Sequence, residues 1–510
     1  MPEDHAAWVF LGFVDELDLS AFEAAFRADG VGRPPYAPKS ILALVLYCNS
    51  KKLHSGREIS AACHDDIGAR VIMGNRHPDR TVFDRFLKVH KRALEELFPQ
   101  TLRLGHAEGL VDVSVVAGDG TKVVANAAMG ATVDEPALHA QIADLEQRLQ
   151  QAQDEWAEQL TASGDGVPGS LFDDEPDAVP DGESGGVFSQ ALFGGWSGDR
   201  PEGRGQVEAW RRISVLRSML GSRQAALTYL REHPGSALGD WQDRLTRDQV
   251  RVAACEQRLE AVRAELTAAG VRRQEILDAG GRIPGKRPVP VEDHIRVRRA
   301  RKDLQTAVDR AAATAKNPPT RDKVNTTDPR SRIMPGKHDG FDQRYNIQAM
   351  ACKNQFILGI TVHDSPNDKR AMIDLLDAAR GNLDTAGITE AIGVALFDNG
   401  YASEANFTTP VPADLLLVAV EKECRQTGRR RDGTSNAAHV WRAMADRLAE
   451  PGNSDLYKRR AAIIEPLFAQ LFMRFGRNLA LRGENIDTEI FLWAITHNLL
   501  KINRSRRKKT

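Results

Sequence analysis

The chain has 510 residues, of which 42% are hydrophobic and 27% charged, a composition typical of a globular protein with two to four domains. No apolar stretch approaches the roughly 18 residues of a membrane span, and the acidic start lacks the basic residues of a signal peptide, so no membrane partner is expected. The five scattered cysteines argue against disulfides or a zinc knuckle and predict a reducing cytoplasm.

The formal net charge of −1 conceals two opposed blocks of charge. Residues 161–203 are acidic and rich in glycine and proline, whereas the last ten residues are strongly basic. A near-neutral total made of such blocks is compatible with DNA binding. The acidic stretch lacks apolar periodicity, which predicts a disordered loop.

Residues 1–110 are predicted to form a compact all-α N-terminal domain. Ser40 is expected to cap a helix over the apolar run 41–46, a second helix begins near Ser55 or Arg57, and a third follows Thr81. Several arginines and lysines give these helices basic faces. The pattern fits either an ordinary solvated bundle or a helix-turn-helix-like DNA-binding domain, and nothing in it identifies a recognition helix.

A β-branched segment at residues 113–124 predicts a buried strand that is interrupted or turned at Gly118-Asp119-Gly120. The pattern then changes to heptad spacing, which runs from Leu138 to Leu160 and returns in the sequence after the acidic stretch. We therefore predict that residues 130–316 form a helical insertion arm, an antiparallel coiled-coil hairpin that carries the loop 161–203 at or near its tip.

The β pattern returns after Pro318-Pro319, and the chain closes with helices. This order of elements predicts an α/β RNase H-like catalytic domain made of residues 111–129 and 317–503, followed by a basic tail at 504–510. The expected strands are 345–352, 356–362, 392–397 and 415–420, and the expected helices are 369–380, 457–476 and 487–502.

Three carboxylates are candidates for two-metal phosphoryl chemistry, which needs acidic side chains from separate elements around two cations. Asp119 and Asp398 each follow an apolar run and lie on strands that are neighbours in an RNase H-like sheet. Glu465 lies at the edge of the apolar face of the helix 457–476, where a metal would satisfy a partly buried charge. The ordinary alternatives are turn residues for the aspartates and an exposed glutamate beside Pro466.

Hard cations prefer carboxylate oxygens, so the predicted cofactor is a pair of Mg²⁺ ions, for which Mn²⁺ can substitute. Lys458 and Arg460 lie near Glu465 on the same helix and are expected to contact DNA phosphates beside the metals. Asp364 and Asp368 are interpreted as turn and cap residues. These two are the reserve candidates if Asp119 proves misplaced.

Several blocks of sequence, in order along almost the whole chain, resemble bacterial insertion-sequence transposases of the DDE class, in particular those grouped as IS family 1182. Each block alone is weakly specific, whereas the ordered set is highly specific. The main blocks are Thr81-Val82-Phe83-Asp84-Arg85-Phe86, Asp119-Gly120-Thr121-Lys122, Asp328-Pro329-Arg330-Ser331-Arg332, Asp398-Asn399-Gly400-Tyr401, Tyr457 with Arg460 and Glu465-Pro466-Leu467-Phe468, and Arg482-Gly483.

The resemblance implies a bacterial, nucleoid-associated DNA transposase that binds terminal inverted repeats, hydrolyses phosphodiesters with two metal ions and transfers strands to target DNA. Asp119, Asp398 and Glu465 would be catalytic and metal-binding, and the partners would be double-stranded DNA and further copies in a homodimer or larger synaptic complex. The expected DNA-binding residues are Lys122, Arg332, Tyr457, Lys458, Arg460, Arg474, Arg477 and Arg482.

One position departs from the family pattern. Many relatives have a lysine seven residues after the glutamate, and here that residue is Phe472. Arg474, Arg477 or Lys458 could supply the missing cation. This substitution keeps open an alternative function, a catalytically silent or domesticated DNA-binding protein, and a stand-alone nuclease is a third hypothesis.

Overall fold

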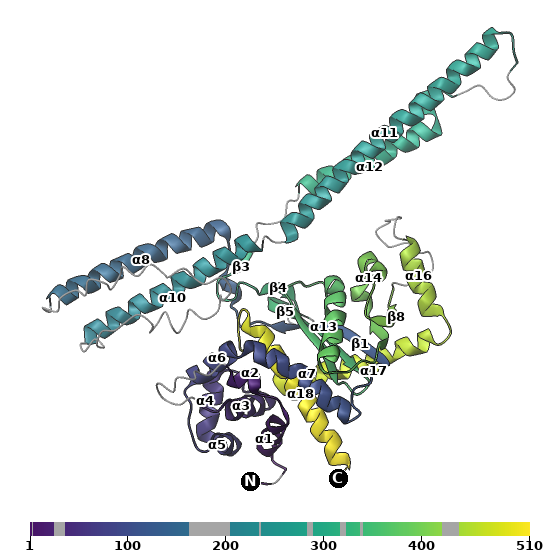
Figure 1. The fold of residues 1–510 in the computed structure, drawn as a ribbon. Helices are drawn as coiled ribbons and strands as arrows, with labels where there is room; N and C mark the ends of the chain where they lie inside the picture. The colour runs from purple at the N-terminus through teal and green to yellow at the C-terminus, as the bar shows by residue number, and fades with distance from the viewer. Residues whose placement is uncertain are drawn as a thin grey trace. The chain divides into compact units, whose positions relative to one another are not determined.

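The structure is a computed structural model of the chain (Figure 1). Two compact units are present, residues 1–132 with 147–222 and 325–510, and residues 133–146 with 223–324. The structure describes residues 1–2, 4–24, 36–162, 204–233, 236–282, 289–316, 323–336, 340–420 and 438–509.

The N-terminal region is helical, as predicted, and local capping explains where its helices begin. Ser55 caps α4 in a reciprocal pair with Glu58, which confirms the predicted start near Ser55. The other two predicted caps are wrong: α3 begins at Pro38, whose missing amide is tolerated in a first turn, and Asp79 rather than Thr81 caps α6. The helices are α1 (Ala6–Glu16), α2 (Ser20–Glu23), α3 (Pro38–Ser50), α4 (Gly56–Asp65), α5 (Ile67–Met73), α6 (Arg80–Val89) and α7 (Lys91–Ala107).

A mixed sheet forms the centre of the first unit, in the order β4-β5-β1-β7-β8, with β6 also paired to β5. The strand β5 is antiparallel to β1, β4 and β6. The strand β7 lies between β1 and β8 and is parallel to both. The α/β class predicted from the sequence is therefore confirmed. The strands are β1 (Val115–Val124), β4 (Arg332–Pro335), β5 (Phe341–Cys352), β6 (Ile357–His363), β7 (Ile392–Phe397) and β8 (Ala413–Val418).

The strand β1 runs through the predicted turn without interruption. Gly118, Asp119 and Gly120 all pair with β5, so the expected break at these residues is wrong. Both glycines serve close packing instead: a Cβ on Gly118 would overlap the ring of Phe397, which lies against the strand. Asp119 consequently lies within a strand rather than at the end of one.

Helices from the C-terminal half pack against this sheet, and the apolar core that they share with the N-terminal helices is continuous. The helix α17 contacts β1, β5 and β7, α13 contacts β5 and β6, and α18 contacts β6 and α7. These elements are α13 (Ala371–Thr385), α14 (Glu404–Thr408), α16 (Ala438–Ala449), α17 (Asn453–Phe475) and α18 (Asn485–Lys509).

The basic segment predicted as a separate tail at 504–510 is, up to Lys509, the end of the helix α18. Arg506 pairs with Glu16 at 2.6 Å and with Glu108 at 2.8 Å, and Lys509 also pairs with Glu108 at 2.8 Å. Acidic side chains of the N-terminal region therefore form ion pairs with two of the basic residues of this segment, Arg506 and Lys509.

The long helices of residues 130–316 form two antiparallel pairs rather than one hairpin (Figure 1). Arg212 pairs with Glu155 at 2.8 Å between α8 and α10, and α11 packs on α12 through a small core around Leu259, Val297 and Ala300. The predicted loop 161–203 lies outside the described residues, apart from the last two residues of α8. The bounds are α8 (Glu135–Ala162), α10 (Arg204–Glu232), α11 (Ser236–Asp278) and α12 (Ile295–Lys316), and short strands β2 (Thr132–Asp134) and β3 (Lys323–Asn325) pair with each other.

The helical content predicted for this segment is confirmed, whereas a coiled-coil supercoil stays a prediction. None of the described helices is long and apolar enough to cross a membrane.

Candidate active site

The pairing of β1 with β7 brings Asp119 and Asp398 together. Ala117 pairs with Leu396 in this parallel ladder; Asp119 lies two residues further along β1, and Asp398, two residues beyond Leu396, directly follows β7. Because side chains two residues apart project from the same face, the register places the two carboxylates at the same level. The negative charge of Asp398 is, after burial, a cause of the raised pKa of Asp119, in agreement with this placement.

Asp119 is partly buried and hydrogen-bonded. Its side chain is 23% exposed, and it accepts hydrogen bonds from the Gly120 amide at 2.8 Å and from Arg460 Nη1 at 3.2 Å. Burial and, secondly, the negative charge of Asp398 raise the pKa of Asp119 to about 6, against the opposing effect of Arg460. Asp119 is therefore harder to ionise than an ordinary aspartate, despite its contact with Arg460.

Asp398 directly follows β7 and caps the short helix η4 (Asn399–Tyr401). Its Oδ1 accepts a hydrogen bond from the Gly400 amide at 2.8 Å. Within the described residues, no lysine, arginine or histidine forms an ion pair with Asp398. Among the described residues, the direct contact of this carboxylate is therefore the Gly400 amide.

A buried polar network lies on the face of the sheet opposite to Asp119, because its strand residues pair with neighbours of Asp119. Tyr401 donates its hydroxyl proton to Gln348 Oε1, and Gln348 Nε2 donates to Asp368 Oδ1 at 2.8 Å. Asn346 Nδ2 donates to the same oxygen at 2.8 Å. Tyr401 belongs to a block that carries the family resemblance, but the sequence did not predict that Asn346, Gln348 and Tyr401 lie at the site. Two amide side chains spaced by two residues in an apolar strand were a usable signal.

The helix α17 supplies the remaining groups near the aspartates. The hydroxyl of Tyr457 donates to the carbonyl oxygen of Phe397 at 3.0 Å, directly before Asp398. Arg460 lies one turn later and reaches Asp119. Lys458 does not contact the aspartates of the site: its side chain is 72% exposed, and its ammonium pairs with Asp455 on the same helix at 2.7 Å.

Glu465 is not gathered with the two aspartates. Its side chain is exposed, and at 100° per residue it lies about 140° around α17 from Arg460, the residue that meets Asp119. Throughout the described ranges, no three Asp, Glu, His or Cys side chains are close enough together to hold one metal ion. The structure thus brings together two of the three predicted carboxylates.

Phe472, which replaces the lysine of the family pattern, carries a cation on its ring. The guanidinium of Arg477 lies 4.1 Å from the ring centroid. Arg474 is half-buried, and burial followed by the nearby charge of Arg504 lowers its pKa. Of the three substitutes considered, Arg477 is therefore the one located at Phe472.

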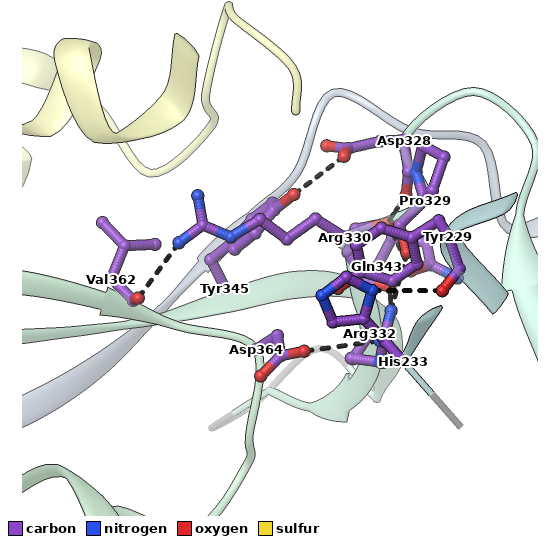
Figure 2. Close-up of polar contacts among 11 residues, drawn as sticks. Tyr229, His233, Asp328, Pro329, Arg330, Arg332, Gln343, Tyr345, Val362 and Asp364 are labelled. Carbon is purple, nitrogen blue, oxygen red and sulfur yellow. Dashed lines mark hydrogen bonds and ion pairs between the residues drawn. The ribbon is translucent and has the colours of Figure 1, made fainter. Parts of the chain in front are cut away.

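The other predicted DNA-binding residues differ in the contacts that their side chains make within the protein. Lys122 is half-buried on β1, whereas Arg482 donates to the carbonyl of Asn126 at 2.6 Å and Arg332 pairs with Asp364 at 3.3 Å (Figure 2). Arg332 and Arg482 are consequently engaged within the fold.

The block around Asp328 has a structural role. Asp328 is fully buried and accepts hydrogen bonds from the Tyr345 hydroxyl at 2.8 Å and the Gly483 amide at 3.2 Å, and Arg330 donates to the Val362 carbonyl at 3.2 Å (Figure 2). These contacts join the approach to β5 with the Arg482-Gly483 block. Two of the blocks that carry the family resemblance are therefore explained by their contact with each other.

Comparison with known proteins gives one match, in the N-terminal region. Residues 1–89 match the family model described as Transposase domain (DUF772). This region is similar to a transposase domain. The matched range ends at the last residue of α6, and it therefore covers the helical region and stops before the sheet. No curated protein and no solved structure matches the chain.

Proposed function

We propose that this protein is a DNA transposase of the DDE class, which binds the terminal inverted repeats of an insertion sequence, hydrolyses phosphodiester bonds and transfers the freed 3′ ends to target DNA. The observation that carries the proposal is the juxtaposition of Asp119 and Asp398 on adjacent parallel strands. It gains weight from the transposase-domain match of residues 1–89, which supports a role in DNA processing.

The strand arrangement supports an RNase H-like catalytic domain. The three strands β1, β5 and β6 follow one another as an antiparallel meander, and β7 and β8 add in parallel on the other side of β1. This layout agrees with the order of elements expected for that domain. It also brings β1 next to β7, so two residues 279 positions apart in sequence become neighbours.

The donor set suits two Mg²⁺ ions, or Mn²⁺ in their place. Carboxylate oxygens are the preferred ligands of these hard cations, and a cation would favour the ionised form of Asp119, whose pKa is raised. Asp119, Asp398 and Glu465 would hold the metals, which when bound activate a water or a 3′ hydroxyl and stabilise the leaving oxygen. Glu465 is exposed on α17 and would have to approach the aspartates for the three to share the metals.

The chain's own cations would position the DNA. Arg460 is held beside the aspartates by its contact with Asp119, and from there it would meet a phosphate that enters the site. Lys458 and Arg477 are exposed and would contact phosphates outside it. We propose double-stranded DNA as the partner, bound by a homodimer or larger synaptic complex.

A catalytically silent DNA-binding protein is the second candidate, and two observations favour it. Glu465 faces solvent away from the aspartates, and Phe472 replaces the family's lysine. Both features would be tolerated in a protein that retains the fold and the DNA contacts but has lost the reaction.

The decisive experiment uses a duplex taken from the inverted repeats that flank the gene. Cleavage and binding are measured in parallel with Mg²⁺ or Mn²⁺ for the wild type and for Asp119→Asn, Asp398→Asn and Glu465→Gln. All three substitutions should abolish cleavage and preserve binding, because phosphate contacts elsewhere dominate affinity.

Glu404→Gln is the matched control, since Glu404 is an exposed carboxylate close to Asp398 in sequence. It should cleave like the wild type. Full cleavage by any of the three variants would remove that residue from the site. A wild type that binds tightly and never cuts would establish the silent alternative.

A further inference from the structure

Asp368 occupies a position that its interpretation as a turn or cap residue does not explain. It is the first residue of the short helix η3 (Asp368–Arg370), and the side chain that caps this helix belongs to Asn367. The hydrogen bonds of Asp368 lead away from its own turn: Oδ1 accepts from Asn346 and from Gln348, each at 2.8 Å. Both amides are buried, so this oxygen has a fixed position.

The other oxygen of Asp368 faces Asp398 across Gly400. A Cβ on Gly400 would lie 2.9 Å from Asp398 Oδ1 and 3.2 Å from Asp368 Oδ2. Both oxygens therefore approach one point, and only a glycine at position 400 leaves that space open. Two carboxylates directed at a common space repel each other unless a proton or a cation lies between them.

The buried phenol of Tyr401 links Asp368 to Asp398, and Asp398 in turn neighbours Asp119 across the β1–β7 pairing. The Tyr401 hydroxyl donates to Gln348, which donates to Asp368, and the Tyr401 backbone amide donates to the carbonyl oxygen of Asp398 at 3.3 Å. Over the described parts of the chain, Arg460 with Asp119 is the ion pair made by these aspartates, and neither Asp368 nor Asp398 has a cationic partner within 4 Å.

We infer that Asp368 shares a cation with Asp398 in the space beside Gly400, past the end of β7, and that Asn346 and Gln348 hold Asp368 in place. The inference rests on the proposed function, because that function supplies the metal. It adds a carboxylate that the family's three-residue pattern does not include. A metal ligand at Asp368 also gives the buried side chains of Asn346, Gln348 and Tyr401 a role, because such groups orient the carboxylates that bind a metal.

The first test is Mn²⁺ binding by the full-length protein, followed by the electron paramagnetic resonance signal of free Mn²⁺. Asp368→Asn should weaken binding at least about tenfold, as Asp398→Asn should, because each removes a charged ligand. Asp364→Asn is the matched control: this aspartate lies four residues earlier, is 44% exposed and pairs with Arg332. It should bind Mn²⁺ like the wild type.

The second test distinguishes a metal ligand from a residue that only supports the fold. Thiolates favour soft cations, so Asp368→Cys should bind Cd²⁺ more tightly than the wild type and Mn²⁺ more weakly. Asp364→Cys controls for any introduced thiol and should not bind Cd²⁺ with the same gain. This reversal of preference stays measurable if Asp368→Asn proves unstable.

The outcomes distinguish a failure of the inference about Asp368 from a failure of the proposed function. If Asp398→Asn weakens Mn²⁺ binding while Asp368→Asn binds like the wild type, the inference about Asp368 is wrong and the proposed function stands. Equal Cd²⁺ binding by the two cysteine variants would also refute it. If the wild type shows no saturable Mn²⁺ binding, the metal chemistry of the proposed function fails and the inference fails with it.

Discussion

Glu489 provides a test of how the helix α18 is placed against the end of α17. The side chain is 2% exposed, and its oxygens accept hydrogen bonds from the backbone amides of Ala480, at 3.1 Å, and Leu481, at 2.8 Å. These amides lead into Arg482, which donates to the carbonyl oxygen of Asn126 just beyond β1. Burial raises the pKa of Glu489 to about 7, more than the hydrogen bonds lower it.

The raised pKa predicts a stability that falls as pH rises. The folded protein holds the Glu489 proton more tightly than the unfolded chain, whose carboxyl has the ordinary pKa of 4.5. The contribution of Glu489 to the free energy of unfolding is therefore complete below pH 4.5, and it is lost as the pH rises through about 7. At about 1.4 kcal/mol per pH unit, the loss in the free energy of unfolding is about 3 kcal/mol.

The perturbation is Glu489→Gln, which keeps the shape and removes the charge. Its amide nitrogen cannot accept a hydrogen bond, so a constant cost of about 1 kcal/mol is expected at every pH. Relative to the wild type, the variant should gain about 3 kcal/mol between pH 4.5 and pH 8.

Denaturant unfolding followed across this pH range measures the difference, with Glu484→Gln as the control. Glu484 is a nearby glutamate with a side chain 59% exposed, and it should show no such gain. A difference between Glu489→Gln and the wild type that stays constant with pH would refute the placement of Glu489 in an apolar interior.

Two further predictions concern the site. Gly120→Ala should lower the free energy of unfolding by about 1–3 kcal/mol, because the new Cβ would overlap the Gln348 amide and lie 2.7 Å from Asp368 Oδ1. Gly130→Ala, which meets no atom within 4 Å, is the control, and equal unfolding curves would contradict the packing. Arg477→Ala should weaken duplex binding and flatten its salt dependence by about 0.9 log unit if Arg477 replaces the family's lysine. Adding Phe472→Lys should restore both, and unchanged binding by the single variant would argue against a DNA contact.

The sequence by itself determined the elements whose signals are local. The apolar run identified β7 with its observed bounds, and the helix predicted to start near Ser55 or Arg57 is α4, which Ser55 caps together with Glu58. Local signals gave a wrong prediction where one sequence pattern is compatible with two structures. Glycines on both sides of Asp119 are typical of a turn, yet they also allow side chains to pack against a continuous strand, which is their role in β1.

Only the tertiary structure decided which side chains meet. Asp119 contacts Arg460 from a helix that begins more than 300 residues later, and carboxylate oxygens of Asp368 and Asp398 both lie beside Gly400. The direction of Glu465 was equally undetermined, because helical periodicity fixes its angle to neighbours on α17 but not the face that α17 turns towards the sheet. Such contacts depend on strand pairing and helix packing between distant segments, and no local pattern of residues contains that information.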